Sequence, residues 1–415
     1  MIRRPLTILG LLTGLNLLNY MDRFLLAAVL PRVIKELQLS DFEGGAMATV
    51  FLLGYFVTSP LFGSLGDRGG RKKLIALGVG LWSLATVGSG LATSAAMRFA
   101  ARARVGVGEA SYATLAPTIL DDLAPPNRRG RWLAVFYLAT PVGSALGYLL
   151  GGAIEHAYGW RATFFAAGLP GLLLAIICLF IVEPQRVGAP PPSILESLRA
   201  LRGRPLYVQC VLGYCASTFA VGGFAFWAPT YLYRAYALPL ERANFLFGAV
   251  TVAAGAVGTA LGGLLGDHFT RRVETSDGDL ATSIGNLRVC AISGWLAAPA
   301  AAVAVLSGSP LAFFLAMGLC EAALFMSSSP VNAVLLRGVP ATLRASAMAV
   351  SIFSIHLFGD LWSPPAVGAL TDRLPPVAGF LPMQIPMLLL PLAVLGSALL
   401  WTFPRRQPGQ HLGSG

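Results

Sequence analysis

Long apolar runs follow one another along almost the whole chain, and short charged or proline-rich stretches separate them. A helix needs about 20 mostly apolar residues to cross a bilayer, and the runs are about this long. The pattern therefore predicts twelve membrane-spanning helices. Their expected positions are 6–30, 45–66, 73–95, 98–120, 132–156, 162–183, 206–234, 243–266, 288–306, 310–336, 343–371 and 380–403.

The composition of the 415 residues supports this assignment. Hydrophobic residues make up 55% of the chain and charged residues 12%, whereas about 25% of the residues of an average soluble domain are charged. Twelve helices of about 20 residues also leave too little chain for a large catalytic domain outside the membrane. We expect an all-α membrane protein with twelve transmembrane helices.

The distribution of positive charge predicts the orientation in the membrane. Twenty of the thirty Lys and Arg residues fall on one side of the expected spans, seven fall in loops on the other side, Arg98 among them, and three lie within spans. Cytoplasmic loops carry the excess of Lys and Arg. We therefore expect both termini in the cytoplasm of a multi-pass protein of the plasma or inner membrane. The net charge of +11 then reflects orientation, and we expect no nucleic-acid partner.

No metal or redox chemistry is expected. None of the five cysteines forms a CxxC pair, so we predict no disulfide, no zinc site and no cofactor.

A polar, proline-rich segment divides the chain into six plus six spans. We predict an N-terminal bundle at 1–183, a cytoplasmic linker at 184–205, a C-terminal bundle at 206–404 and a cytoplasmic tail at 405–415. Within the linker, Ser193 and Glu196 have the spacing of a capping box. The residues that follow suggest a short amphipathic helix on the inner membrane surface; a solvated linker is the alternative.

The two halves resemble each other. The segment 63–67 reappears as 263–267, and Glu109-Ala110 in the fourth span is matched by Glu321-Ala322 in the tenth. Two parallel six-helix bundles suit a transporter that rocks around a central site.

The segment after the second span carries glycines, an acid and several cations. Glycines permit close helix approach, and an acid followed by cations can form an inter-helix ion pair that is made in one conformation and broken in another. A simple topology signal is the alternative. The predicted conformational latch comprises Gly63, Gly66, Asp67, Arg68 and Arg71, with Asp267 and Arg271 in the second half.

This segment resembles the signature of the major facilitator superfamily, and the resemblance covers the whole chain. Four stretches resemble the Spinster-type lipid transporters: residues 19–23 (NYMDR), Arg102 with residues 106–117 (GVGEASYATLAP), residues 136–137 (FY) and residues 141–144 (PVGS). The resemblance implies two six-helix bundles with a cavity between them. It also implies export of sphingoid phosphates or lysophospholipids.

Ionisable residues inside the expected spans are the main functional signal. A charge that faces lipid at mid-bilayer costs about 2.5 kcal/mol or more, so such residues should face a cavity or partners. We predict that a cluster binds the substrate head group through Arg23 and Arg102 and couples protons through Asp22 and Glu109. A static set of salt bridges between the first and fourth spans is the alternative.

Further polar and aromatic residues are expected to line a substrate cavity. An aromatic face beside a charged cluster suits an amphiphile, and ordinary packing or interfacial anchoring is the alternative. The pair His356 and Asp360 could titrate near neutral pH, and a satisfied core pair is the alternative. The predicted cavity residues are Asn16, Asn19, Tyr20, Tyr112, Phe224, Trp227, Tyr231, Glu321, His356 and Asp360.

The combined prediction is a secondary active transporter, working by alternating access as a monomer, for an anionic amphiphilic lipid. Its partners are the substrate, protons and the bilayer. An exporter of small organic anions or drugs is the first alternative, and a non-transporting receptor or scaffold is a distant one. An intramembrane enzyme is not expected, because HExxH, GxSxG and phosphate-binding-loop motifs are absent.

Overall fold

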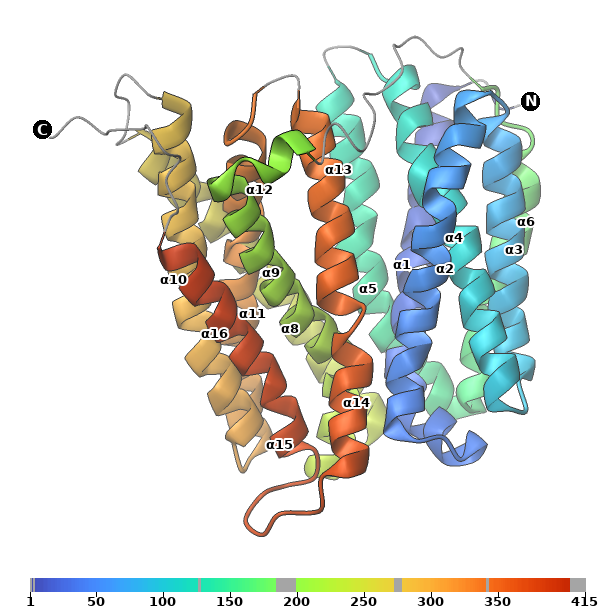
Figure 1. Cartoon of the computed structure of the whole chain (residues 1–415). Helices are drawn as coiled ribbons and strands as arrows, with labels where there is room; N and C mark the ends of the chain where they lie inside the picture. Colours follow the sequence, from blue (N-terminus) through green and yellow to red (C-terminus); the bar gives the residue numbers. More distant parts are fainter. Residues whose placement is uncertain are drawn as a thin grey trace, which may run out of the picture. The chain divides into compact units, whose positions relative to one another are not determined.

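The computed structural model describes residues 2, 4–125, 128–183, 199–271, 278–340 and 343–403. Within these ranges the chain is helical apart from short connections and one isolated parallel bridge between Ile2 and Ile181. Figure 1 shows the helices in chain order. They are α1 (Pro5–Leu37), α2 (Asp41–Asp67), α3 (Arg71–Leu91), α4 (Ala95–Leu123), α5 (Arg129–Tyr158), α6 (Trp160–Cys178), α8 (Pro205–Ala235), α9 (Leu240–Arg271), α10 (Gly278–Leu306), α11 (Pro310–Met326), α12 (Ser328–Arg337), α13 (Arg344–Ile355), the π-helix η2 (His356–Asp360), α14 (Ser363–Arg373), α15 (Gln384–Met387) and α16 (Leu389–Thr402).

Nine helical segments of the described chain are long and apolar enough to cross a membrane. Three further segments bring this number to the twelve expected. The first two, α1 and α4, are long enough but carry polar and charged residues along their length. The third is divided by η2 into α13 and α14. The predicted all-α membrane fold is confirmed.

Serine caps define where several helices begin. The Ser40 hydroxyl accepts a hydrogen bond from the backbone N–H of Glu43, and the Ser40 backbone N–H donates to the Glu43 carboxylate, forming a complete capping box at the start of α2. Ser94 and Ser309 cap α4 and α11 in the same manner through their hydroxyls. These caps satisfy backbone N–H groups that have no partner within the helix.

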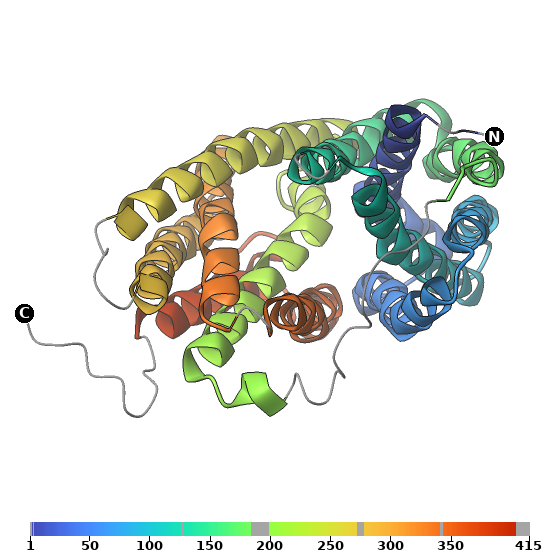
Figure 2. The ribbon, with the colours of Figure 1, turned by 90° about the horizontal axis from the view of Figure 1, so that it is seen from above.

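The described contacts divide the chain into two compact units. Unit 1 comprises residues 1–189, 225–249 and 364–373, and unit 2 comprises residues 190–224, 250–363 and 374–415. In unit 1, α1 packs mainly on α5, α2 on α4, and α3 on both α4 and α6. Figure 2 shows the helices of the first 180 residues, coloured blue to green, end on.

Two glycines allow α3 and α4 to pack closely in unit 1. A Cβ added to Gly78 would lie 2.6 Å from the Gly108 carbonyl oxygen, and one added to Gly108 would lie 2.5 Å from the Gly78 carbonyl oxygen. Only glycine permits this approach of two helix backbones. The core around it includes Trp82, Tyr112 and Phe136.

Unit 2 has its own apolar core. In it, α10 packs on α11 and α16. Tyr207, Cys210, Leu287, Val331 and Trp401 are among the buried side chains at its centre.

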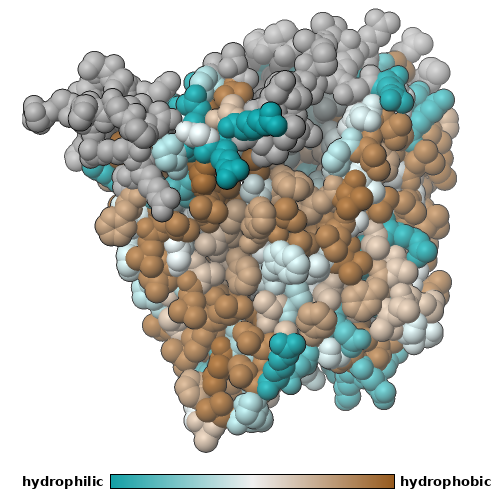
Figure 3. All heavy atoms as spheres, in the orientation of Figure 1, coloured by the Kyte–Doolittle hydropathy of each residue, from teal (hydrophilic) through white to brown (hydrophobic). Residues whose placement is uncertain are grey.

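Large apolar side chains also cover the outside of the helices. Leu77, Leu173, Leu264 and Leu315 are among the most exposed, and Figure 3 shows many hydrophobic side chains on the face in view, with hydrophilic ones mainly near its edges. Extended apolar surface of this kind would be unusual on a soluble monomer. It is the surface expected of helices in contact with lipid.

The predicted linker and tail fall largely outside the described residues. Of the expected amphipathic helix, residues 199–202 are described and helical, with Leu201 buried. The predicted bundle boundaries stay predictions.

Candidate functional site

Asp22 of α1 is buried in unit 1 with 2% of its surface exposed. Its Oδ2 accepts a hydrogen bond from the Thr86 hydroxyl of α3. Its Oδ1 has no hydrogen-bond partner among the described residues. A buried carboxylate normally requires several donors or a bonded cation. The carboxyl therefore retains the capacity to bind a proton or a further donor.

Arg23, the next residue, forms an ion pair with Glu109 of α4. Its Nε donates to Oε2 of Glu109 at 2.7 Å. The Glu109 side chain is fully buried, whereas 20% of the Arg23 side chain is exposed. One side of the pair is thus enclosed by protein and the other is partly accessible.

Aromatic rings surround the Arg23 guanidinium. Its central carbon lies 5.0 Å from the ring centre of Tyr20, 5.1 Å from Phe51 and 5.3 Å from Tyr55. Ring faces attract cations, so α1 and α2 together hold this charge in position. An arginine fork with free N–H groups can also bind a phosphate or carboxylate.

Arg102 lies on α4, seven residues before Glu109, and 3% of its surface is exposed. Its guanidinium lies 4.8 Å from the centre of the Phe51 ring. It acts electrostatically on both Asp22 and Glu109. The structure therefore brings Asp22, Arg23, Arg102 and Glu109 into one cluster within unit 1; the functions assigned to them stay predictions.

Arg98 belongs to the same region, although the sequence pattern placed it in an outer loop. It lies in the first turn of α4, has no exposed surface, and acts electrostatically on Asp22. Its guanidinium lies against the aromatic rings of Trp160 and Phe164 of α6. A local signal that Arg98 lies within the helix is Ser94, a residue typical of a helix N-cap four positions earlier.

The remaining polar residues of α1 pack in different ways. Asn16 is buried and its Nδ2 donates to the Phe136 carbonyl at 2.9 Å. Asn19 is buried, and its Nδ2 has no partner within the described chain. Tyr20 is partly exposed beside Arg23. Asn19 and Tyr20 therefore keep polar atoms or surface for a ligand, whereas Asn16 is engaged by α5.

Tyr112 of α4 is fully buried in the apolar core of unit 1. Its hydroxyl donates to the Leu12 carbonyl, and its ring packs edge-on against Trp82 with 5.5 Å between ring centres. In this conformation the side chain joins α1, α3 and α4.

The three predicted aromatic residues of α8 are all buried. Trp227, in unit 1, donates from Nε1 to the Pro364 carbonyl at 2.9 Å. Tyr231, also in unit 1, packs edge-on against Tyr236. Phe224 belongs to unit 2. The α8 aromatics thus have packing partners in the conformation described.

Glu321 of α11 is a buried acid in unit 2. Its Oε1 accepts a hydrogen bond from the Thr251 hydroxyl of α9 at 3.0 Å. Its Oε2 has no hydrogen-bond partner among the described residues. Unlike Glu109, its counterpart in the sequence repeat, it forms no ion pair within the described chain.

His356 and Asp360 form a close pair in unit 2. Nδ1 of His356 lies 3.0 Å from Oδ1 and 2.9 Å from Oδ2 of Asp360. They are the first and last residues of η2. Single π-turns within α-helices often occur at functional sites, and both side chains are partly exposed.

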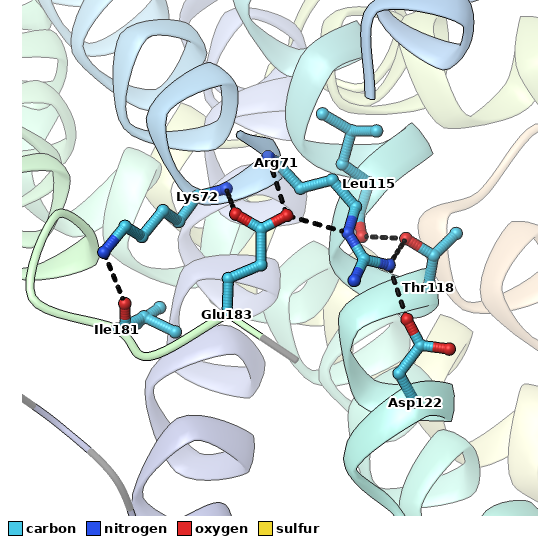
Figure 4. Close-up of polar contacts among 7 residues, drawn as sticks. All are labelled: Arg71, Lys72, Leu115, Thr118, Asp122, Ile181 and Glu183. Atoms are coloured by element: carbon cyan, nitrogen blue, oxygen red, sulfur yellow. Dashed lines mark hydrogen bonds and ion pairs between the residues drawn. The ribbon is translucent and has the colours of Figure 1, made fainter. Parts of the chain in front are cut away.

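Of the predicted latch residues, Arg71 at the start of α3 forms ion pairs (Figure 4); a role as a latch stays a prediction. Its Nη1 donates to Asp122 at 2.7 Å and its Nε to Glu183 at 3.1 Å. The Glu183 carboxylate also accepts from the Arg71 backbone N–H at 3.0 Å. Arg71 thus joins the beginning of α3 to the end of α4 and to the segment after α6.

The other latch residues lie nearby or in the repeat. Gly66 allows the Leu115 side chain to approach where a Cβ would clash, whereas Gly63 has more space around it. Arg68 follows α2 and is exposed, as is Asp267 near the end of α9. The side chains of Asp67 and Arg271 lie outside the described residues.

The described residues contain no group of three or more His, Cys, Asp or Glu side chains that could hold a metal ion. The chemistry of the cluster around Asp22 is that of two carboxyl groups and several fixed cations. Such a set can exchange a proton and bind an anion.

Comparisons with known proteins relate this geometry to a family. Residues 12–359 match the Major Facilitator Superfamily. The chain is 35% identical to protein spinster homolog 1 of Bos taurus, over 98% of this chain and 83% of that protein. It is 33% identical to sphingosine-1-phosphate transporter SPNS2 of Danio rerio, over 90% of this chain and 77% of that protein.

A solved structure has the same fold. It is the crystal structure of a bacterial homolog to the human lysosomal transporter Spinster, in an inward-facing and unoccupied conformation. The match has a TM-score of 0.80 and 23% sequence identity, and covers 96% of this chain and 94% of that one. The chain therefore belongs to the Major Facilitator Superfamily and, within it, to the Spinster family of transporters.

Proposed function

We propose that the protein is a secondary active transporter that carries an anionic amphiphilic lipid, of the sphingoid phosphate or lysophospholipid class, by alternating access. Proton coupling occurs through Asp22 and Glu109. The similarity to the sphingosine-1-phosphate transporter SPNS2 of Danio rerio supports the substrate class. Apolar side chains along the helices suit a substrate with a lipid tail.

The ion pair between Arg23 and Glu109 is the observation that carries the proposal. Glu109 is enclosed, and Arg23 is partly exposed. An anionic head group that reaches Arg23 competes with Glu109 for the positive charge of the guanidinium. Once released, Glu109 would be an ionised carboxylate in a buried site, which is unfavourable without a partner. Proton uptake by Glu109 then accompanies head-group binding.

Asp22 supports this coupling from the neighbouring position. It has one hydrogen-bond donor, Thr86, and one oxygen without a partner among the described residues. Because Asp22 and Glu109 repel each other as anions, a proton on one of them favours the ionised form of the other. The two acids therefore act as a coupled pair.

The remaining features complete the proposal. His356, Asp360 and Glu321 contribute polar groups from unit 2, and the Arg71 latch stabilises one of the alternating conformations. The protein works as a monomer in the plasma or inner membrane, with both termini in the cytoplasm.

Transport by the purified protein in liposomes tests the proposal. The probes are a fluorescent lysophospholipid, sphingosine-1-phosphate and a panel of short organic anions, each with and without an imposed pH gradient. We expect transport of a lipid probe that the gradient accelerates. Asp22→Asn and Glu109→Gln should abolish the effect of the gradient, whereas Arg104→Gln, an exposed position on α4, should preserve it.

Each alternative has its own outcome in this assay. Transport of the organic anions without the lipids would instead support a small-anion exporter. Wild-type rates and gradient dependence in both Asp22→Asn and Glu109→Gln would refute the coupling mechanism. The absence of flux for every probe would favour a receptor or scaffold.

A further inference from the structure

Arg98 is buried, and no carboxylate among the described residues is bonded to it. Its Nη1 donates to the Ser89 carbonyl of α3 at 2.6 Å. Its Nε and Nη2 have no hydrogen-bond partner in the described part of the chain. Burying a cation costs several kcal/mol unless other charges or dipoles compensate it, so its position in the core requires an explanation.

Two aromatic rings account for part of the compensation. The guanidinium carbon lies 4.1 Å from the ring centre of Phe164 and 5.1 Å from that of Trp160. Ring faces stabilise a cation most when it is removed from water. The rings also restrict the guanidinium to one orientation, because Phe164 and Trp160 belong to one face of α6.

The backbone of α3 places this cation beside Asp22. Thr86, which donates to Asp22, and Ser89, whose carbonyl accepts from Arg98, are three residues apart on α3 and therefore lie on the same face. The two residues of α3 that bind Asp22 and Arg98 are thus within one turn of each other. On α4, Arg98 and Arg102 are four residues apart and also share a face.

The charges of the cluster do not balance. Glu109 is paired with Arg23, which leaves Asp22 as the one acid facing both Arg98 and Arg102. Among the described residues, the charged groups that act on Asp22 are Arg102, Arg98, Arg23 and, by repulsion, Glu109. Thr86 from α3 contributes a hydroxyl, and Arg161 of α6 acts on Arg98 itself.

We infer that Arg98 is a positioning residue whose fixed, buried positive charge favours the ionised form of the Asp22 carboxyl and so lowers the pH at which Asp22 accepts a proton. This inference rests on the proposed proton coupling. It adds a residue whose described hydrogen bond goes to Ser89 and not to Asp22. Arg98 acts through the electric field that it exerts within a medium of low dielectric constant.

The protonation of Asp22 can be measured without any transport. The carbonyl band of its protonated carboxyl is followed by infrared spectroscopy against pH in the full chain in lipid, and Asp22→Asn identifies the band. We expect Arg98→Met to raise the midpoint of this titration by about one pH unit or more, because an opposite charge nearby favours ionisation by this amount. Arg98→Lys should restore most of the shift, and Arg104→Met, an exposed cation of α4, should leave the midpoint unchanged.

A purely structural Arg98 would give a different result. Arg98→Met would then lower the thermal stability equally in the presence and absence of Asp22 and would leave the Asp22 midpoint where it is. That outcome overturns the inference.

A second comparison covers the case in which Arg98→Met alone does not fold. Asp22→Asn leaves Arg98 without its counter-charge, so the double variant Asp22→Asn/Arg98→Met should unfold at a higher temperature than Asp22→Asn. A lower unfolding temperature for the double variant also overturns the inference. If either measurement gives the expected result but the liposomes show no flux, the inference about Arg98 stands and the proposed function is refuted.

Discussion

Arg234 binds the carboxylate of Asp41 through both of its terminal nitrogens, at 2.7 Å to Oδ2 and 2.8 Å to Oδ1. The Asp372 carboxylate accepts from the backbone N–H groups of Asp41 and Phe42, at 2.9 and 2.8 Å. All of these residues belong to unit 1. The first turn of α2 is therefore held in two ways. Arg234 of α8 binds the Asp41 side chain, and Asp372 of α14 binds the backbone of the turn.

Arg234→Met should weaken this connection. It removes two charge-assisted hydrogen bonds to a mostly buried carboxylate, which contribute about 1.5–3 kcal/mol in comparable cases. We expect a lower thermal unfolding midpoint in detergent, with partial recovery in Arg234→Lys, which retains the charge but lacks the fork. Arg242→Met, at an exposed position of α9, is the matched control. Equal midpoints for Arg234→Met and Arg242→Met would contradict the prediction.

Arg71→Met should have a larger effect at the other end of unit 1. Arg71 is 3% exposed and binds both Asp122 and Glu183, and its loss leaves two partly buried carboxylates close together. Removing one partner of a buried ion pair costs about 3 kcal/mol. The measurement is chemical or thermal unfolding of the purified protein. Arg68→Met removes an exposed cation three residues earlier and should be nearly neutral; a similar loss in both variants would argue against the bonded geometry.

The acid of unit 2 gives a third prediction. Thr251→Val removes the hydroxyl that donates to Glu321 while preserving the shape of the side chain. Because Glu321 has no ion pair within the described residues, losing its donor should destabilise the protein by about 1–3 kcal/mol. Thr251→Ser retains the hydroxyl and should lose much less. If the Val and Ser variants unfold at the same temperature, the hydrogen bond contributes nothing.

Glu36, at the end of α1, predicts a pH dependence of stability. Hydrogen bonds from Trp160, at 2.6 Å, and from Arg161 lower the pKa of Glu36 below its usual value. A carboxyl with a lowered pKa in the folded state stabilises the protein above its ordinary pKa of about 4.3, and this contribution disappears as the pH falls through the lowered value. Glu36→Gln should therefore be less stable than the wild type at neutral pH.

The same two proteins should become similar in acid. Unfolding midpoints of wild type and Glu36→Gln, measured from neutral pH down to about pH 3, should converge below the ordinary pKa of Glu. A constant difference across this range would show that the substituted side chain changes packing rather than ionisation.

The sequence predicted the membrane fold because hydropathy and length are local properties of the chain. Ionisable residues within spans must face partners, which is why the sequence drew attention to Asp22, Arg102 and Glu109; their assigned functions stay predictions. The partners themselves could not be predicted. Thr86, which donates to Asp22, is an ordinary small residue of an apolar helix, and the pairing of Glu109 with Arg23 depends on how α1 and α4 are rotated.

Arg98 shows where local patterns mislead. A cation near the beginning of a span is usually exposed, and the sequence pattern therefore placed it outside the membrane. Its burial depends on Trp160 and Phe164, more than sixty residues later in the chain. Tyr112 was predicted to line the cavity; in the structure its hydroxyl binds the Leu12 carbonyl in the core of unit 1, and a role in the cavity stays a prediction.

The π-helix η2 affects how the eleventh span must be studied. The N–H of Leu361 donates to the carbonyl of His356, five residues earlier, at 3.1 Å, so one more residue is used here than an α-helix would need. A helical wheel drawn through 344–373 with a uniform period of 3.6 residues misplaces everything after Asp360 by about 100°. Scanning mutagenesis or spin labelling of this span should therefore be indexed separately before and after Leu361, or opposite faces of the helix will be confused.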